Sequence, residues 1–255
     1  MDQAKRQKQK RTLKWVIWGI IGIAVIAYLF ALPSPLFDVP YSTAVYARNG
    51  ELLGAKVAAD GQWRFRPQES LPDNYIEAVL EYEDRRFHKH PGVSVAAIAR
   101  AVRDNLKAGR IVSGGSTLTM QLVRLSRGNP PRTFGEKLLE MILATRIECS
   151  YTKEEILELY AAHAPFGGNV VGLEAATWRY FGHSPSDLSW AEAATLAILP
   201  NSPSMIIPSR GREQQPVKRD RLLQQSFEQE ANDSLEHSTA LKQQPPGVPV
   251  NTLRT

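Results

Sequence analysis

One segment near the start of the chain is apolar throughout. Residues 15–32 contain no charged side chain, and a helix of that length measures roughly 27 Å, enough to cross the hydrocarbon core of a bilayer. Six of the first 14 residues are Lys or Arg, so the positive-inside rule predicts that this end stays in the cytoplasm. A cleaved signal peptide is the alternative, but the apolar run is long and Leu29 stands where a small residue would be needed. We therefore expect an uncleaved transmembrane anchor.

The body that follows predicts a small β hairpin and then helices. Residues 44–47 and 52–57 flank Asn49-Gly50, a dipeptide typical of tight hairpin turns. Beyond Leu71 the apolar positions recur mostly with helical spacing. Capping boxes, in which Ser or Thr precedes Glu by three positions, mark two expected helix starts at Thr152 with Glu155 and at Ser189 with Glu192. The pattern predicts a mostly α fold.

Composition narrows the class of protein. Hydrophobic residues make up 43% of the chain and charged residues 22%, which suits a globular domain with a sizeable core and excludes a disordered or fibrous protein. The net charge of +5 resides in the first 14 residues, so the body is neutral and lacks the basic surface of a nucleic-acid binder. The single Cys149 excludes an internal disulfide, and with five scattered histidines it excludes the usual structural zinc sites.

A carboxylate lies among apolar residues in one expected helix. Three residues share the helix face of Glu83, namely Ile76, Leu80 and Phe87. Burial would raise the pKa of the Glu83 carboxyl, which suits a general base or acid. An ion pair with Arg86, or a capped and partly exposed Glu, is the alternative that the spacing alone favours.

A glycine-rich turn precedes the helical pattern at residues 118–125. In the run 114–117, Gly115, Ser116 and Thr117 bring backbone N–H groups and two hydroxyls to the positive end of a helix dipole, where phosphate can bind. A simple Ser/Thr cap after a glycine turn is the commoner use of such residues. Nearby basic residues would add charge for a phosphate or form a solvated face: Arg103, Arg110, Arg124, Arg132 and Lys137. Lys137 and Glu140 share a face, although most such pairs are surface ion pairs.

Together these segments resemble glycosyltransferase family 51, the peptidoglycan polymerases of class A penicillin-binding proteins, and most closely their 1C branch. The resemblance covers about residues 41–208, with five motifs in the family's order. The first motif, 83–92, contains Glu83, Asp84, Phe87, His90 and Gly92. The second, 114–121, contains Gly115, Ser116, Thr117 and Gln121, the third ends at Glu140, the fourth is 156–160 with Glu158, and the fifth combines 175–182 with 192–194.

The resemblance implies a lysozyme-like domain that polymerises lipid II into β-1,4-linked glycan strands and releases undecaprenyl pyrophosphate. Glu83 would take the proton from the acceptor's 4-hydroxyl, with inversion at the anomeric carbon, and Glu140 would support the leaving-group side. The residues that would bind the pyrophosphate are Ser116, Thr117, Gln121, Arg124 and Lys137. Mg²⁺ is a suitable partner for pyrophosphate, although the sequence contains no dedicated ligand set.

The expected organisation follows from the pattern and the resemblance together. The parts are a cytoplasmic basic tail at 1–14, a transmembrane anchor at 15–32, a linker at 33–40, the glycosyltransferase domain at 41–208 and a truncated or partly disordered tail at 209–255, with one helix near 218–227. The chain would lie in the bacterial inner membrane with its catalytic domain on the periplasmic or extracellular side. Its partners would be lipid II, the growing glycan strand and other cell-wall synthesis proteins. Trp63 with Phe65, or the helix after Ser94, would dip into the membrane.

Two departures from the family leave an alternative open. Glu136 stands where the family usually has Arg, and Ala162 stands where it usually has Asn. A truncated pseudoenzyme that binds lipid II or cell-wall partners without catalysis is therefore the second hypothesis. A lysozyme-like hydrolase ranks last, because it has no need of the Gly-Ser-Thr segment. Ser150 and Lys153 match the Ser-x-x-Lys of penicillin-binding transpeptidases, but no partner motifs follow, so we expect no transpeptidase activity.

Overall fold

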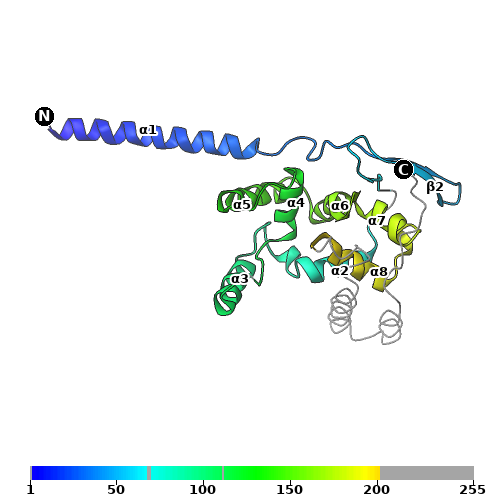
Figure 1. The fold of residues 1–255 in the computed structure, drawn as a ribbon. Helices are drawn as coiled ribbons and strands as arrows, with labels where there is room; N and C mark the ends of the chain where they lie inside the picture. Colours follow the sequence, from blue (N-terminus) through cyan, green and yellow to red (C-terminus); the bar gives the residue numbers. More distant parts are fainter. Residues whose placement is uncertain (1, 68–69, 111, 202–255) are drawn as a thin grey trace.

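A computed structural model describes residues 2–67, 70–110 and 112–201 (Figure 1). Its helices and strands are α1 (Asp2–Leu29), β1 (Thr43–Tyr46), β2 (Leu52–Lys56), α2 (Asp73–Glu83), α3 (Val95–Ala108), α4 (Leu118–Ser126), α5 (Phe134–Glu148), α6 (Lys153–His163), β3 (Pro165–Gly167), β4 (Val170–Val171), α7 (Leu173–Tyr180) and α8 (Trp190–Ile198). Short 3₁₀ turns lie at Phe87–Lys89, Pro185–Asp187 and Leu199–Asn201. The expected tail at 209–255, with its helix near 218–227, lies outside the described residues.

The mostly α architecture with a small hairpin is confirmed. Strands β1 and β2 pair antiparallel around the Asn49-Gly50 turn, where Gly50 has a φ of +85° that favours glycine. A second two-stranded sheet, β3–β4, was not expected from the sequence. It receives a parallel bridge from Trp63 to Val170, which ties the segment after the hairpin to the helical body.

Both predicted capping boxes are present. The Thr152 hydroxyl accepts from the Glu155 amide while the Glu155 carboxylate accepts from the Thr152 amide, and the same reciprocal pair starts α8 at Ser189. Each box satisfies two backbone donors that have no partner within the helix. The local sequence thus sets where α6 and α8 begin.

The core lies between the helices of the body, where α2 packs against α8 and α4 packs against α5 and α6 (Figure 1). Its largest fully buried aromatic side chains are those of Phe65, Tyr75, Phe87, Tyr160 and Phe166. Trp63 is 4% exposed and Phe65 is 1% exposed, and their rings contact edge to face. The expectation that these two residues dip into a membrane is therefore wrong, because both are part of the core.

Helix α1 projects away from the body and meets it near its C-terminal end (Figure 1). There the Tyr28 hydroxyl is hydrogen-bonded to Thr145 at 3.1 Å, and the Arg146 guanidinium donates to the Leu29 carbonyl at 3.0 and 3.2 Å. Among the described residues, no helix is at once long enough and apolar enough to span a membrane. The transmembrane helix expected at 15–32 is therefore not supported by the structure.

Candidate active site

Glu83 is the last residue of α2 and is half-buried. Its carboxylate accepts a hydrogen bond from the Gln121 side-chain amide on α4 at 2.6 Å. The helix ends here because the Asp84 backbone leaves the helical conformation, with a φ of −158° and a ψ of 72°. Phe87 therefore lies on a separate 3₁₀ turn. The prediction that it shares a helix face with Glu83 is wrong, but Phe87 is buried, with 1% of its surface exposed. Glu83 is thus oriented by a residue of another helix.

The positive end of α4 is occupied by a carboxylate of the protein itself. Asp84 accepts from the Leu118 amide at 3.1 Å and from His90 Nε2 at 3.0 Å. The Thr117 hydroxyl accepts from the Met120 amide at 3.1 Å and donates to the Gly92 carbonyl, so Thr117 is a buried N-cap. Because these two amides already have partners, a bound pyrophosphate would depend on side chains near the start of α4.

Those side chains come from the second and third motifs. Lys137 Nζ donates to the Ser116 hydroxyl and, at 2.9 Å, to the Glu140 carboxylate. The Glu140 side chain is 7% exposed while that of Lys137 is 39% exposed. The pair is therefore not the ordinary surface ion pair that its spacing indicates. A buried carboxylate holds an ammonium group that solvent, or an anionic ligand, can reach.

Further basic residues line the turn between α4 and α5. Arg124 donates to the Pro130 carbonyl at 3.2 Å, and its buried Nε has no hydrogen-bond partner among the described residues. Arg127 forms an ion pair with Glu136, and the hydrogen bond from Arg127 lowers the pKa of the Glu136 carboxyl. The acidic residue that departs from the family pattern is thus neutralised by Arg127.

Two glycines of the motifs allow close backbone approach. A Cβ on Gly92, which has a φ of +85°, would lie 2.7 Å from the Ala144 carbonyl oxygen, and a Cβ on Gly115 would lie 2.9 Å from the Ile98 Cα. Both contacts are too short for any larger residue without a backbone shift. Glycine at these positions lets the loops of the first two motifs pack against α5 and α3.

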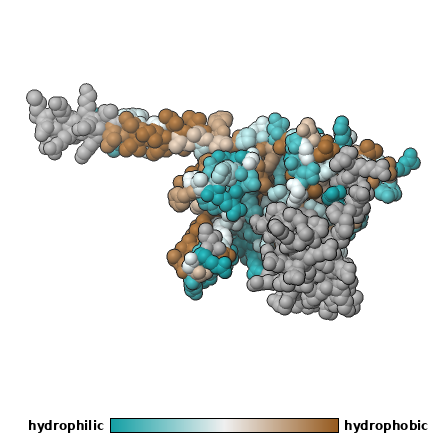
Figure 2. Space-filling model, viewed as in Figure 1, coloured by the Kyte–Doolittle hydropathy of each residue, from teal (hydrophilic) through white to brown (hydrophobic). Residues whose placement is uncertain are grey.

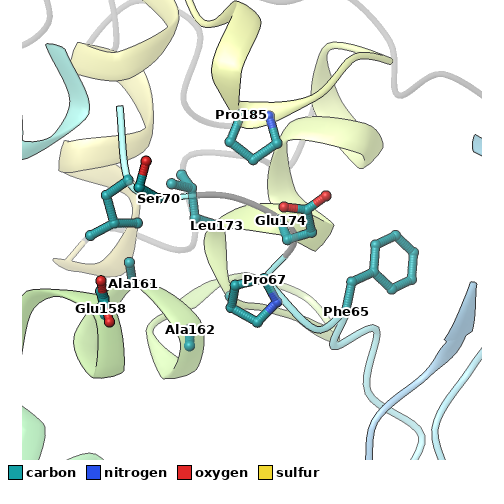
Figure 3. Close-up of a pocket in the computed structure, with 11 residues that line it drawn as sticks. Phe65, Pro67, Ser70, Glu158, Ala161, Ala162, Leu173, Glu174 and Pro185 are labelled. Atoms are coloured by element: carbon teal, nitrogen blue, oxygen red, sulfur yellow. The ribbon is translucent and has the colours of Figure 1, made fainter. Parts of the chain in front are cut away.

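Glu158 and Ala162 lie at a different place. Both line a cavity of about 280 Å³ together with Phe65, Glu174 and Pro185 (Figure 3). Its lining does not include Glu83 or the Lys137–Glu140 pair. Glu158, named from the fourth motif, thus lines a cavity that Glu83 does not line, and the replacement at Ala162 faces the same cavity.

Among the described residues, no group of three or more His, Cys, Asp and Glu side chains is arranged to hold a metal ion. Glu140 is bound by Lys137 and Asp84 by His90, so these two carboxylates already have partners within the protein.

Comparison with known proteins places these residues in a family. Residues 50–227 match the family model described as Transglycosylase. The chain belongs to the transglycosylase family. All thirteen motif residues named from the sequence lie within this matched transglycosylase region.

Relatives of this transglycosylase domain are penicillin-binding proteins. The chain is 45% identical over 193 residues to penicillin-binding protein 1C of Escherichia coli K12, which covers 75% of this chain and 25% of that protein. It is 35% identical over 237 residues to penicillin-binding protein 1A of Pseudomonas aeruginosa, covering 85% and 28%. The crystal structure of penicillin-binding protein 1A from Haemophilus influenzae is similar with a TM-score of 0.45 and 21% identity, over 85% of this chain and 22% of that one. The chain thus spans about a quarter of the length of these relatives, and the expected likeness to the 1C branch is confirmed.

One group of polar side chains in the transglycosylase domain was not predicted from the sequence. Lys153 binds Glu148 and the His90 carbonyl, and Glu148 also accepts from Thr119. No local pattern signals this group, because the partners are separated by up to 63 residues in the chain.

Proposed function

We propose that the chain is a peptidoglycan glycosyltransferase that polymerises lipid II into β-1,4-linked glycan strands and releases undecaprenyl pyrophosphate. The observation that carries the proposal is the arrangement around the first turn of α4. On one side Gln121 orients the half-buried Glu83 carboxylate, and on the other Lys137 joins Ser116 to a buried Glu140. A base and a cationic group thus flank one helix start, which suits a transfer from a pyrophosphate leaving group.

The reaction follows from the roles of these groups. Glu83 accepts the proton of the acceptor sugar's 4-hydroxyl as that oxygen forms a bond to the donor's anomeric carbon. The bond from this carbon to the pyrophosphate oxygen breaks on the opposite face, so the centre inverts and the electron pair leaves with the lipid pyrophosphate. Lys137 and Ser116 stabilise the developing negative charge, Arg124 adds positive charge nearby, and Glu140 holds the Lys137 ammonium in place.

We also infer that the domain works at a membrane, with residues 15–32 holding it there and the basic end on the cytoplasmic side. Supporting this, apolar side chains are exposed on three helices, and Figure 2 shows them along α1 and on the neighbouring edges of α5 and α3. Those more than half exposed include Trp15, Trp18, Ile23 and Phe30 near α1, Val95, Val102 and Leu106 on α3, and Phe134 and Leu138 on α5. A surface of this kind binds lipid more readily than water. Flotation with liposomes tests it, and a protein that stays at the bottom of the gradient contradicts it.

We propose no transpeptidase activity for this chain. Lys153 Nζ binds Glu148 and the His90 carbonyl, while the exposed Ser150 hydroxyl is hydrogen-bonded to Arg146. This Ser-x-x-Lys pair therefore lacks the contact between base and nucleophile that acylation needs. A labelled penicillin should leave the protein unmodified.

The decisive experiment is polymerisation of labelled lipid II by the detergent-solubilised full chain. We expect glycan ladders that disappear with Glu83→Gln and with moenomycin, an inhibitor that the family resemblance suggests. Glu83→Gln keeps the shape of the side chain and its contact with Gln121. The variant should therefore lose activity while its thermal unfolding curve stays unchanged. Lipid II binding without ladders in the wild-type protein would instead establish the pseudoenzyme.

A further inference from the structure

We propose that Lys153 and Glu148 are positioning residues for Glu83. Their partly buried ion pair holds the loop 84–92 against α4, and so fixes the Glu83 carboxylate relative to the cationic group at Ser116. This inference rests on the proposed function, and neither residue touches the reacting atoms. Three sets of contacts carry it.

The first set belongs to Lys153, the first residue of α6. Its ammonium donates to the His90 carbonyl at 2.9 Å and lies 4.2 Å from the centre of the Phe87 ring. Both contacts are with the loop that follows Glu83. The side chain is 20% exposed, so these interactions are shielded from water and are stronger than those of a surface lysine.

The second set belongs to Glu148, the last residue of α5. Its carboxylate binds the Lys153 ammonium at 2.8 Å and accepts a hydrogen bond from the Thr119 hydroxyl at 2.6 Å. The Glu148 side chain is 9% exposed and Thr119 is fully buried. Glu148 therefore connects the start of α6 to the first turn of α4, the helix that carries Gln121.

The third set joins the loop to the start of α4. Asp84 follows Glu83 directly, and its carboxylate binds both the Leu118 amide and the His90 ring. Lys153 holds His90 from the other side, through its carbonyl. His90 of the loop is thus held at two points, its ring by Asp84 and its carbonyl by Lys153. An ion pair that is largely withdrawn from water adds little net stability compared with apolar packing. Small displacements of a base, in contrast, lower a rate strongly, so we assign the pair to positioning.

The test compares four variants of the full chain in steady-state polymerisation. Lys153→Met removes the charge and keeps the length, Thr119→Val removes only the hydroxyl, Lys153→Arg keeps the charge, and Lys56→Met alters an exposed lysine of β2 as the matched control. We expect Lys153→Met to lower kcat on the order of 10- to 100-fold with little change in KM. Thr119→Val should lower kcat less, Lys153→Arg should restore most of it, and Lys56→Met should leave it unchanged.

A second readout does not depend on activity. Hydrogen exchange should speed up in peptides covering 84–92 in Lys153→Met and stay unchanged in peptides covering 173–180. If the wild-type protein makes no ladders, the proposed function fails. Hydrogen exchange in peptides covering 84–92 then tests by itself whether Lys153 holds the loop in place. An active wild type with unchanged kcat in Lys153→Met and Thr119→Val overturns the positioning role. A kcat loss that Lys153→Arg does not restore, or exchange that rises across the whole domain, would show a general structural role and also overturn it.

Discussion

His163 should make the fold sensitive to mild acid. It is the last residue of α6 and is 8% exposed, and its ring stacks on Phe37 of the linker with 3.7 Å between ring centres and 6° between planes. Burial, together with the charge of Arg64, lowers the pKa of His163 from 6.5 to about 4. The ring is therefore neutral in the folded protein at pH values where it would be charged in the unfolded chain.

The sign and size of the effect follow from linkage. Between pH 6.5 and pH 4 the unfolded state binds more protons at this site than the folded state, so the free energy of unfolding falls as the pH falls. The two pKa values give a loss of about 2 kcal/mol between pH 7.5 and pH 5. Well above the unfolded-state pKa of 6.5 the contribution is constant, because His163 is neutral in both states.

Urea denaturation of the solubilised protein at pH 7.5 and pH 5 measures this loss. His163→Phe keeps an aromatic ring against Phe37 and removes the titration, so its acid-induced loss should be smaller by about 2 kcal/mol. His88→Gln changes an exposed histidine and serves as the control for replacing a histidine. If His163→Phe loses as much stability in acid as the wild type, the buried neutral ring is not the cause and the reasoning is refuted.

Three further predictions concern the motifs and a cap. Gly92→Ala should lower the melting temperature far more than Gly61→Ala, because both have positive φ but only Gly92 has a carbonyl within 2.7 Å of the added Cβ; equal shifts in calorimetry would contradict this. Thr152→Ala should cost about 1 kcal/mol in urea denaturation, since it removes the cap of α6; an unchanged midpoint would show that the cap is replaced by solvent. Lys137→Ala should lower polymerisation kcat at least about tenfold, and wild-type rates would remove Lys137 from the anion site.

Local signals predicted the elements well. The Asn49-Gly50 turn and the capping boxes at Thr152 and Ser189 depend on residues within a few positions, and all three are present. Burial was harder to predict, because apolar residues occur both in the core and on exposed faces. Phe65 is buried while Leu106 is 78% exposed, and nothing in their immediate neighbours distinguishes them.

For the candidate site, the sequence named residues but not the contacts between them. The motifs named Glu83, Ser116, Lys137 and Glu140, and the structure joins the last three directly. That Asp84 would supply the anion at the start of α4 could not be predicted, because the two are 34 residues apart and meet only through packing. At this helix start the Thr117 hydroxyl is a local acceptor, whereas the Asp84 carboxylate comes from a distant part of the chain.

The contact between α1 and α5 makes α5 a spacer of fixed length. Arg146 holds the last carbonyl of α1, and Lys137 lies nine residues earlier on the same rigid helix, roughly 14 Å along its axis. Adding one residue between them would rotate Lys137 by about 100° around the axis, whereas adding a whole turn would keep its direction and move it by about 5 Å. The number of residues in α5 between these two positions thus sets both the distance of the Lys137 ammonium from the C-terminal end of α1 and the direction in which it points.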